Sequence, residues 1–429
     1  MTFREVAARL FPWDFIDGDP DAILDELQRD TRTNSFYPVI LMHDEKRPLS
    51  ELYYPHNPRR KVYWTEDSRA YWHFDPDFYG DSRIKPLPSE DSELVDTDWV
   101  RFSTDLARRR GMNVGVELSH TWVDKRRLVS ELSDCLQRDV YGQSFRSSMC
   151  VNHPDTRSYA RALFTELATR YELDYVQTCF YGFEGAPSYR EKIGEVARLA
   201  RLPRGGCFCD HCRREAEAQN LAWDAIVDRL RWIADGFDRF NAKQAFELNL
   251  LLHSTTTASQ LFVEMPELFA WFTFRTDSYT RFWKEIYEAA HAARPSIDVR
   301  FNDCWVYPEM LGFDLRAMAP YFDSIRAADY LEQDGDAELM QVKRGFYHSI
   351  RRAVGLEKHF ITALSQRVRA TPDLIKETIL MSAQCGADGT SIASYDTATP
   401  ALMRAVREGF EEAGITVEPS GPGGAPPRA

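Results

Sequence analysis

The sequence lacks any long apolar run. No window approaches the roughly 18 uninterrupted apolar residues of a membrane span, and the opening stretch MTFREVAARLFPWDF lacks the apolar core of a secretory signal. We therefore expect a cytoplasmic protein with no membrane partner, in which thiols stay reduced. The 8 cysteines are then free thiols or metal ligands rather than a disulfide framework.

The chain also lacks an excess of basic residues. Its formal net charge is −13, and the short arginine runs at 108–110 and 351–352 lie among acidic residues. Binding to a phosphate backbone needs a basic stripe. The composition therefore argues against DNA or RNA as a partner.

Short β-rich runs alternate with long amphipathic helices, which is typical of a parallel sheet wrapped by helices. We predict an α/β fold, a (β/α)8 TIM barrel, because 429 residues fit a single domain of this kind. That domain spans 1–418, with a helical insertion at about 213–290 and a Pro/Gly-rich disordered tail at 419–429. The eight predicted strands are Pro38–Met42, Ala70–Phe74, Asn113–Ser119, Leu173–Thr178, Ile297–Phe301, Ile325–Leu331, His359–Leu364 and Thr390–Ser394.

Polar side chains follow almost every predicted strand. In barrels of this kind the chemistry lies at the carboxyl ends of the strands. Carboxylates, amides, imidazoles and aromatic rings together form a pocket suited to sugar hydroxyls. The predicted substrate-binding residues are His43, Asp44, His73, Glu117, His120, Gln177, Tyr181, Asn302, Trp305, Gln333, Gln366 and Tyr395.

Three cysteines lie within six residues, at Cys207, Cys209 and Cys212. Zinc prefers four thiolate or imidazole ligands in a tetrahedron. A fourth ligand must come from elsewhere, and the candidates are Cys150, Cys179 and His211. The cluster predicts a structural zinc site.

The segment from Cys150 to Tyr159, CVNHPDTRSY, resembles the C-x-N-x-P-x-x-R-x-Y segment of family-42 glycoside hydrolases, the β-galactosidases. In that family a helix, the fourth barrel strand and C-x-C-x-x-C follow in the same order, over about 65 residues here. The resemblance implies that Cys150, Cys207, Cys209 and Cys212 bind one zinc ion, and it suggests a homo-oligomer.

The family carries an Asn-Glu pair at the end of strand four and a nucleophilic Glu at strand seven. Here these places read Gln177-Thr178-Cys179 and Ser365-Gln366-Arg367. A glycosidase needs two carboxyl groups flanking the scissile bond, one of them a protonated acid. The predicted pair is Glu332 with Asp303 or Glu184, in a hydrolase acting on a small carbohydrate or glycoside; Glu117 is a further candidate.

Two other functions remain open on the same barrel. A metal-dependent sugar isomerase, epimerase or lyase would bind a divalent ion through carboxylates and imidazoles such as Glu117, His120, Asp303 and Glu332. A non-catalytic sugar-binding barrel would need only the polar pocket.

Overall fold

The computed structural model describes residues 1–42, 57–59, 63, 65–119, 122–179, 182–185, 194–303, 307–365, 369–393 and 395–419. Of Gln333 and Ala337 it describes only the backbone. Within the described residues, no helix combines the length and apolar character that crossing a lipid bilayer requires.

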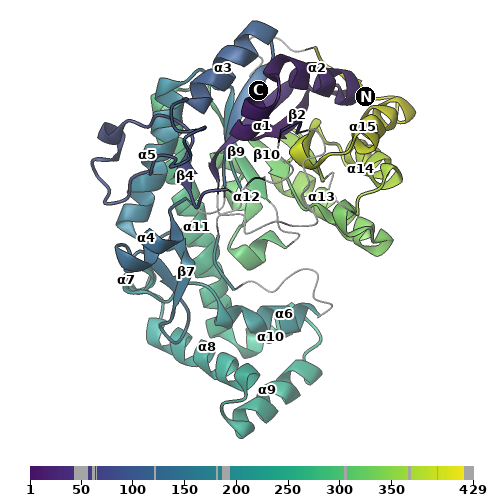
Figure 1. The fold of residues 1–429 in the computed structure, drawn as a ribbon. Helices are drawn as coiled ribbons and strands as arrows, with labels where there is room; N and C mark the ends of the chain where they lie inside the picture. Colours follow the sequence, from purple (N-terminus) through teal and green to yellow (C-terminus); the bar gives the residue numbers. More distant parts are fainter. Residues whose placement is uncertain are drawn as a thin grey trace.

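Eight parallel strands close into a barrel (Figure 1). Each strand pairs with its neighbour around the ring, and the last pairs with the first through Thr390 and Val6. The predicted (β/α)8 fold is therefore confirmed. The strands in order are β2 (Glu5–Leu10), β3 (Ser35–Met42), β5 (Asn113–Leu118), β8 (Tyr175–Thr178), β9 (Asp298–Asp303), β10 (Ser324–Ala327), β11 (His359–Ser365) and β12 (Gly389–Ala393).

One predicted barrel strand is wrong and another was missed. The segment Ala70–Phe74 contributes only to β4 (Arg69–Ala70), which pairs antiparallel with β3 on the barrel's edge. The first barrel strand is β2, which pairs with β12 and β3. Its charged Glu5 and Arg9 side chains are buried inside the barrel. Interior charges remove the apolar pattern by which a strand is recognised in a sequence.

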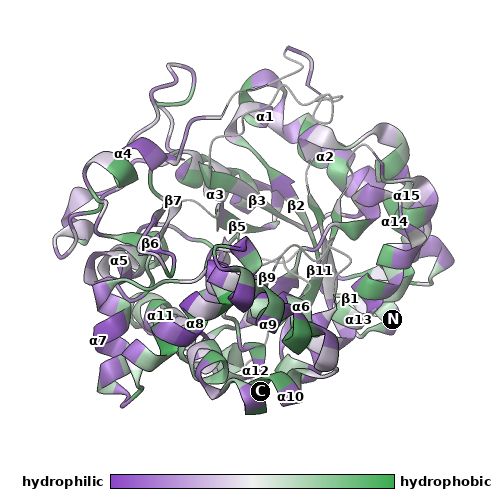
Figure 2. Ribbon diagram, turned by 90° about the horizontal axis from the view of Figure 1, so that it is seen from below, coloured by the Kyte–Doolittle hydropathy of each residue, from purple (hydrophilic) through white to green (hydrophobic). Residues whose placement is uncertain are grey.

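The helices surround the strands, as the view along the barrel shows (Figure 2). At α14, Thr371 Oγ1 accepts a hydrogen bond from the Leu374 backbone at 3.3 Å, which caps the helix just before Pro372. The helices of the ring are α2 (Pro20–Thr31), α3 (Trp99–Arg110), α5 (Pro154–Arg170), α11 (Pro266–Ala293), α12 (Leu315–Met318), α13 (Ala337–Val354), α14 (Pro372–Gln384) and α15 (Pro400–Glu412).

Between β8 and the barrel helix α11 the chain forms additional helices. Figure 1 shows α8, α9 and α10 extending away from the barrel. A hairpin earlier in the chain, β6 (Leu136–Arg138) with β7 (Ser144–Met149), leads into Cys150. The additional helices are α6 (Glu195–Arg201), α7 (Asp210–Ala218), α8 (Trp223–Asp238), α9 (Ala242–Ser254) and α10 (Ala258–Glu264).

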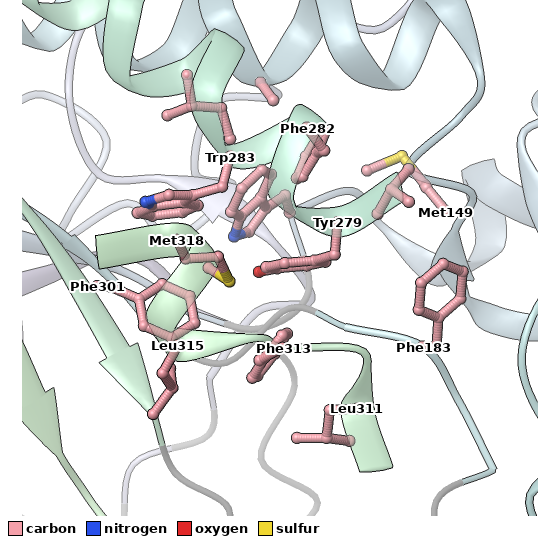
Figure 3. Close-up of a cluster of buried hydrophobic side chains, with 14 of the residues drawn as sticks. Met149, Phe183, Tyr279, Phe282, Trp283, Phe301, Leu311, Phe313, Leu315 and Met318 are labelled. Carbon is pink, nitrogen blue, oxygen red and sulfur yellow. The ribbon is translucent and has the colours of Figure 1, made fainter. Parts of the chain in front are cut away.

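Aromatic packing fixes α11 to the outer face of β9 (Figure 3). The rings of Trp283 and Phe301 lie 5.1 Å apart, and those of Tyr279 and Phe313 lie 4.4 Å apart. All four side chains are buried. Burying a large apolar side chain contributes about 1.5–3 kcal/mol, so this contact holds the long helix in place.

The amino-terminal half of the barrel interior is filled by an ion-pair cluster, here called the lower ring: Glu5, Tyr175, Asp298 and Arg300. Arg300 donates to both Glu5 oxygens at 2.9 Å and to Asp298 at 3.0 Å. Its guanidinium also lies 3.7 Å from the centre of the Tyr175 ring. Gly115 on β5 makes room for that ring, because a Cβ there would lie 2.1 Å from it.

Candidate functional site

A second polar cluster lies above the lower ring, toward the carboxyl ends of the strands. We call it the upper ring: Arg9, Tyr37, Glu117, Gln177, Asn302 and Arg326. Its centre is Glu117 on β5, which is 1% exposed. Arg9 contacts Glu117 Oε1 at 2.8 Å and Gln177 donates to Oε2 at 2.7 Å, so the carboxylate is held in one orientation.

Arg326 completes the upper ring from β10. It donates to Asn302 Oδ1 at 3.3 Å and to the Tyr330 hydroxyl at 2.9 Å, and it lies 4.0 Å from Glu117. Tyr330 adopts a left-handed backbone with φ of 54°. A non-glycine residue in that region costs about 1–3 kcal/mol, and such strain concentrates at functional sites.

Several buried polar atoms of the upper ring have no hydrogen-bond partner within the described part of the chain. They are Arg9 Nε, the Tyr37 hydroxyl and Gln177 Oε1. Burial raises the pKa of Tyr37, so its hydroxyl keeps its proton and can donate or accept. Unpaired donors and acceptors beside a carboxylate suit a ligand that carries hydroxyl groups.

Glu332, the central predicted catalytic residue, lies in a separate ion-pair cluster. Lys343 on α13 reaches Glu332 Oε2 at 2.7 Å and Asp329 Oδ1 at 2.8 Å, and the Ser365 backbone donates to the other Glu332 oxygen. Burial raises the pKa of Glu332. The positive charge of Lys343 acts in the opposite direction but has the smaller effect, so the pKa stays above its ordinary value. Burial alone would lower the pKa of Lys343, but Asp329 and Glu332 raise it.

The other two predicted catalytic carboxyls lie in different places. Asp303 is fully buried. The preceding residue, Asn302, points into the barrel, where Arg326 binds it. Because successive side chains of a strand alternate between its two faces, Asp303 points to the opposite face of β9. Glu184 is half-buried on the loop after β8, where it accepts a hydrogen bond from Ser148 Oγ. The three predicted catalytic carboxyl groups thus come from the end of β9, the loop after β8 and the segment after β10.

Two further predicted binding residues have local partners. The His73 ring contacts the Val95 carbonyl at 3.2 Å and lines a small cavity of about 230 Å³. The Tyr395 hydroxyl donates to Glu26 at 2.8 Å; burial and this bond raise its pKa. The predicted residues His43, Asp44, His120, Tyr181, Trp305 and Gln366, and the Gln333 side chain, lie outside the described residues.

A carboxyl group that the sequence analysis missed follows β2. Asp14, on α1 (Pro12–Asp17), is 4% exposed and accepts a hydrogen bond from the Phe11 backbone at 2.8 Å. Burial raises its pKa well above the ordinary value, and the charge of Asp396, which follows β12, raises it further. Recognising β2 as a barrel strand would have drawn attention to Asp14 at its carboxyl end.

The four predicted zinc ligands lie together. Cys150 Sγ lies 3.5 Å from both Cys209 Sγ and Cys212 Sγ, and all four sulfurs, including Cys207, lie within 4.8 Å of one another. Four ligands about 2.3 Å from a tetrahedral zinc would be separated by roughly 3.8 Å. Of the three open candidates for the fourth ligand, the structure places Cys150 in the group.

The surroundings of the sulfurs also fit a cation. The four cysteines are buried, and the neighbouring thiols raise the pKa of Cys150, so four thiolates need a positive charge between them. Asn152 donates from its backbone to Cys150 Sγ and from its side chain to Cys212 Sγ, each at 3.4 Å. Such donors orient and stabilise metal-bound thiolates.

The glycine pair before the cluster allows a close backbone approach. A Cβ on Gly205 would lie 2.1 Å from the Glu184 carbonyl, and Gly206 has φ of 85°. The Gly206 backbone donates to that same carbonyl at 2.7 Å. The cysteine cluster is thus joined to the loop that carries Glu184.

Comparison with solved structures finds the same barrel fold in two β-galactosidases and a β-amylase. The β-galactosidase of Bacillus circulans sp. alkalophilus superposes with a TM-score of 0.55 at 13% identity, covering 96% of this chain and 56% of that one. The β-galactosidase of the psychrophilic Marinomonas ef1 gives 0.53 at 13%, covering 96% and 60%. The β-amylase catalytic domain of Paenibacillus polymyxa gives 0.51 at 11%, covering 96% and 98%.

These similarities establish the shared barrel fold. The chain spans only 56–60% of the length of those two β-galactosidases. No family model matches the chain, and no curated protein matches its sequence. Fold alone does not determine chemistry, so the function must be argued from the residues at the carboxyl ends of the strands.

Proposed function

We propose that this chain is a glycoside hydrolase that binds a small carbohydrate over the upper ring. The proposal is supported by the barrel it shares with β-galactosidases and a β-amylase. It depends on one observation: a buried carboxylate, Glu117, is held by Arg9 and Gln177 near the carboxyl ends of the strands. The unpaired Tyr37 hydroxyl and Gln177 Oε1 would bind sugar hydroxyls.

Two carboxyl groups with different surroundings suit the two roles in glycoside hydrolysis. We assign the charged, stabilising role to Glu117, because two guanidinium groups surround it. We assign proton donation to the half-buried Glu184, which contacts Ser148. Glu332 acts in this scheme as a positioning residue, since its oxygens bind Lys343 and the Ser365 backbone.

We further propose that the four cysteines bind a structural zinc ion. The ion would connect the end of the β6–β7 hairpin at Cys150 to the start of α7 at Cys209 and Cys212. Zinc with four thiolates leaves no open coordination position, so it supplies folding energy rather than chemistry. Because Gly206 is bonded to Glu184, the site would also fix the loop carrying the proton donor.

The test is turnover of the purified chain on a panel of nitrophenyl glycosides and oligosaccharides. We expect Glu117→Gln and Glu184→Gln each to lower kcat by about 10²-fold or more. Glu288→Gln is the matched control, because Glu288 is 59% exposed on α11. Unchanged turnover in Glu117→Gln would refute the proposed mechanism.

A non-catalytic sugar-binding barrel is the second candidate. It is favoured by two ion pairs, because Glu117 is bound to Arg9 and Glu332 is bound to Lys343. Neither carboxylate is then free to act as an acid or a nucleophile. Carbohydrate binding without turnover across the panel would support it. The metal-dependent alternative needs a group of metal-binding side chains at the strand ends. Within the described residues such groups are the four cysteines and Asp134, Cys135 and His153, and neither includes Glu117.

A further inference from the structure

The two rings inside the barrel have opposite charge balances. In the lower ring one guanidinium, Arg300, contacts two carboxyl groups, Glu5 and Asp298. In the upper ring two guanidiniums, Arg9 and Arg326, surround one carboxylate, Glu117. The upper ring therefore holds one positive charge that its own carboxylate does not balance.

The hydrogen bonding of the two rings differs in the same way. In the lower ring, Nε, Nη1 and Nη2 of Arg300 all donate, and its side chain is 2% exposed. In the upper ring, Arg9 Nε has no partner among the residues that the structure describes, and 9% of the Arg9 side chain remains exposed. Arg300 thus has a full set of hydrogen-bond partners, and so does Arg326, whereas Arg9 lacks one among the described residues.

A buried guanidinium without a full set of partners is costly, because the lost hydration is not replaced. The cost falls when a ligand supplies an anion. Arg326 is buried, and its three nitrogens already donate to Ser391, Asn302 and Tyr330, so its charge is fixed in place. The guanidinium that lacks a partner is that of Arg9. Guanidinium groups bind planar carboxylates through paired, charge-assisted hydrogen bonds.

We infer that the sugar bound by this barrel carries a carboxylate, as a uronic acid does, and that Arg9 recognises it while Arg326 adds a fixed positive charge. This inference rests on the proposed function and names its substrate class. A carboxylate has one negative charge and matches the single unbalanced guanidinium. A phosphate monoester carries about 1.5–2 negative charges near neutral pH and would leave a negative excess.

Binding is measured first, by calorimetry on the full chain, with glucuronate and galacturonate as probes. Glucose and galactose are the neutral counterparts, and glucose 6-phosphate tests the anion type. We expect at least one uronate to bind about ten-fold or more tightly than its neutral counterpart, the gain expected of one charged hydrogen bond. The preference should weaken as salt is added. Equal affinity for the acidic and neutral sugars would overturn the inference.

Two variants test which residues recognise the carboxylate. Arg9→Gln should abolish the preference for the uronate over its neutral counterpart. The readout is the ratio of the two affinities, because Arg9 also holds Glu117 and its loss affects both sugars. Arg9→Lys keeps the charge, so it should retain part of the preference and serves if Arg9→Gln does not fold. Arg109→Gln, at an exposed arginine on α3, should change neither affinity. An undiminished preference in both Arg9 variants would overturn the assignment.

The same probes, offered as nitrophenyl glycosides, separate this inference from the proposed function. Cleavage of neutral glycosides without preference for uronides would refute the acidic substrate alone. Tight uronate binding with no turnover of any uronide would refute the hydrolase and leave the recognition intact. Tighter binding of glucose 6-phosphate than of either uronate would also overturn the carboxylate assignment.

Discussion

The ammonium nitrogen of Lys343 lies 2.7 Å from Glu332 Oε2, with both side chains fully removed from solvent. The same nitrogen lies 2.8 Å from Asp329 Oδ1. Since the Ser365 backbone also donates to Glu332, this one lysine joins helix α13 to the ends of β10 and β11. The cluster therefore stabilises the carboxyl side of the barrel.

Removing the lysine should be strongly destabilising. Lys343→Met would leave two buried carboxylates without a cation, and breaking a buried pair costs about 3–5 kcal/mol. The free energy of unfolding, measured in urea, checks this value. Lys243→Met is the control: Lys243 is 83% exposed, and exposed pairs contribute about 0–1 kcal/mol. Equal stability of the two variants would contradict the structural role.

Asp14 should make stability fall with rising pH. Burial and Asp396 raise its pKa, so the folded chain holds this proton more tightly than the unfolded chain does. The contribution is complete below the unfolded pKa of about 3.9 and is lost as pH rises toward the folded pKa. The difference in stability between Asp14→Asn and the parent should therefore shift in favour of the variant as pH rises. Thermal unfolding of both proteins across a pH series measures this difference.

The Asn variant keeps an oxygen to accept the Phe11 backbone hydrogen bond, so the comparison isolates the charge. Asp224→Asn is the control, because Asp224 is 77% exposed. A stability difference between Asp14→Asn and the parent that stays constant with pH would mean that Asp14 does not titrate differently in the two states.

The cysteine cluster predicts one zinc per chain in the purified protein, measured by elemental analysis. Cys212→Ser should lose the metal and several kcal/mol of stability, because structural zinc binding is folding energy. Cys385→Ser also replaces a buried thiol but lies outside the cluster, so it should keep both the metal and most of the stability. Full metal content in Cys212→Ser would rule out this ligand.

Gly115 and Gly345 form a matched pair of substitutions. A Cβ on Gly115 would lie 2.1 Å from the Tyr175 ring inside the barrel, so Gly115→Ala should destabilise by about 1–3 kcal/mol or more. A Cβ on Gly345, within α13, meets nothing within 4 Å. Gly345→Ala should therefore stabilise by about 0.5–1 kcal/mol. Chemical denaturation of both variants tests whether Tyr175 fills the barrel centre.

Much of the fold could be predicted from the sequence, because outward-facing strand residues pack on helices and produce apolar runs. The strands from Asn113 onward follow that pattern. The spacing of Cys207, Cys209 and Cys212 likewise predicted that their thiols lie together. Strand β2 could not be recognised, since Glu5 and Arg9 carry charge inside the barrel. Their partners, Arg300 and Glu117, lie far along the chain.

The candidate site was predictable only in part. A polar residue at a strand end is visible in the sequence, and Glu117, Gln177 and Asn302 do belong to the upper ring. Whether a carboxyl group is free or paired is not visible. Glu332 shows this, because its partner Lys343 comes from the next helix and looks like an ordinary surface residue in the sequence.

The lower ring also has a consequence for how the protein is made. Glu5 and Arg300 are 295 positions apart, so most of the barrel must be synthesised before this pair can form. Contacts of such long sequence separation slow folding. During translation β2 carries unmatched charges, which keep this first strand hydrated and discourage its aggregation until β9 emerges from the ribosome.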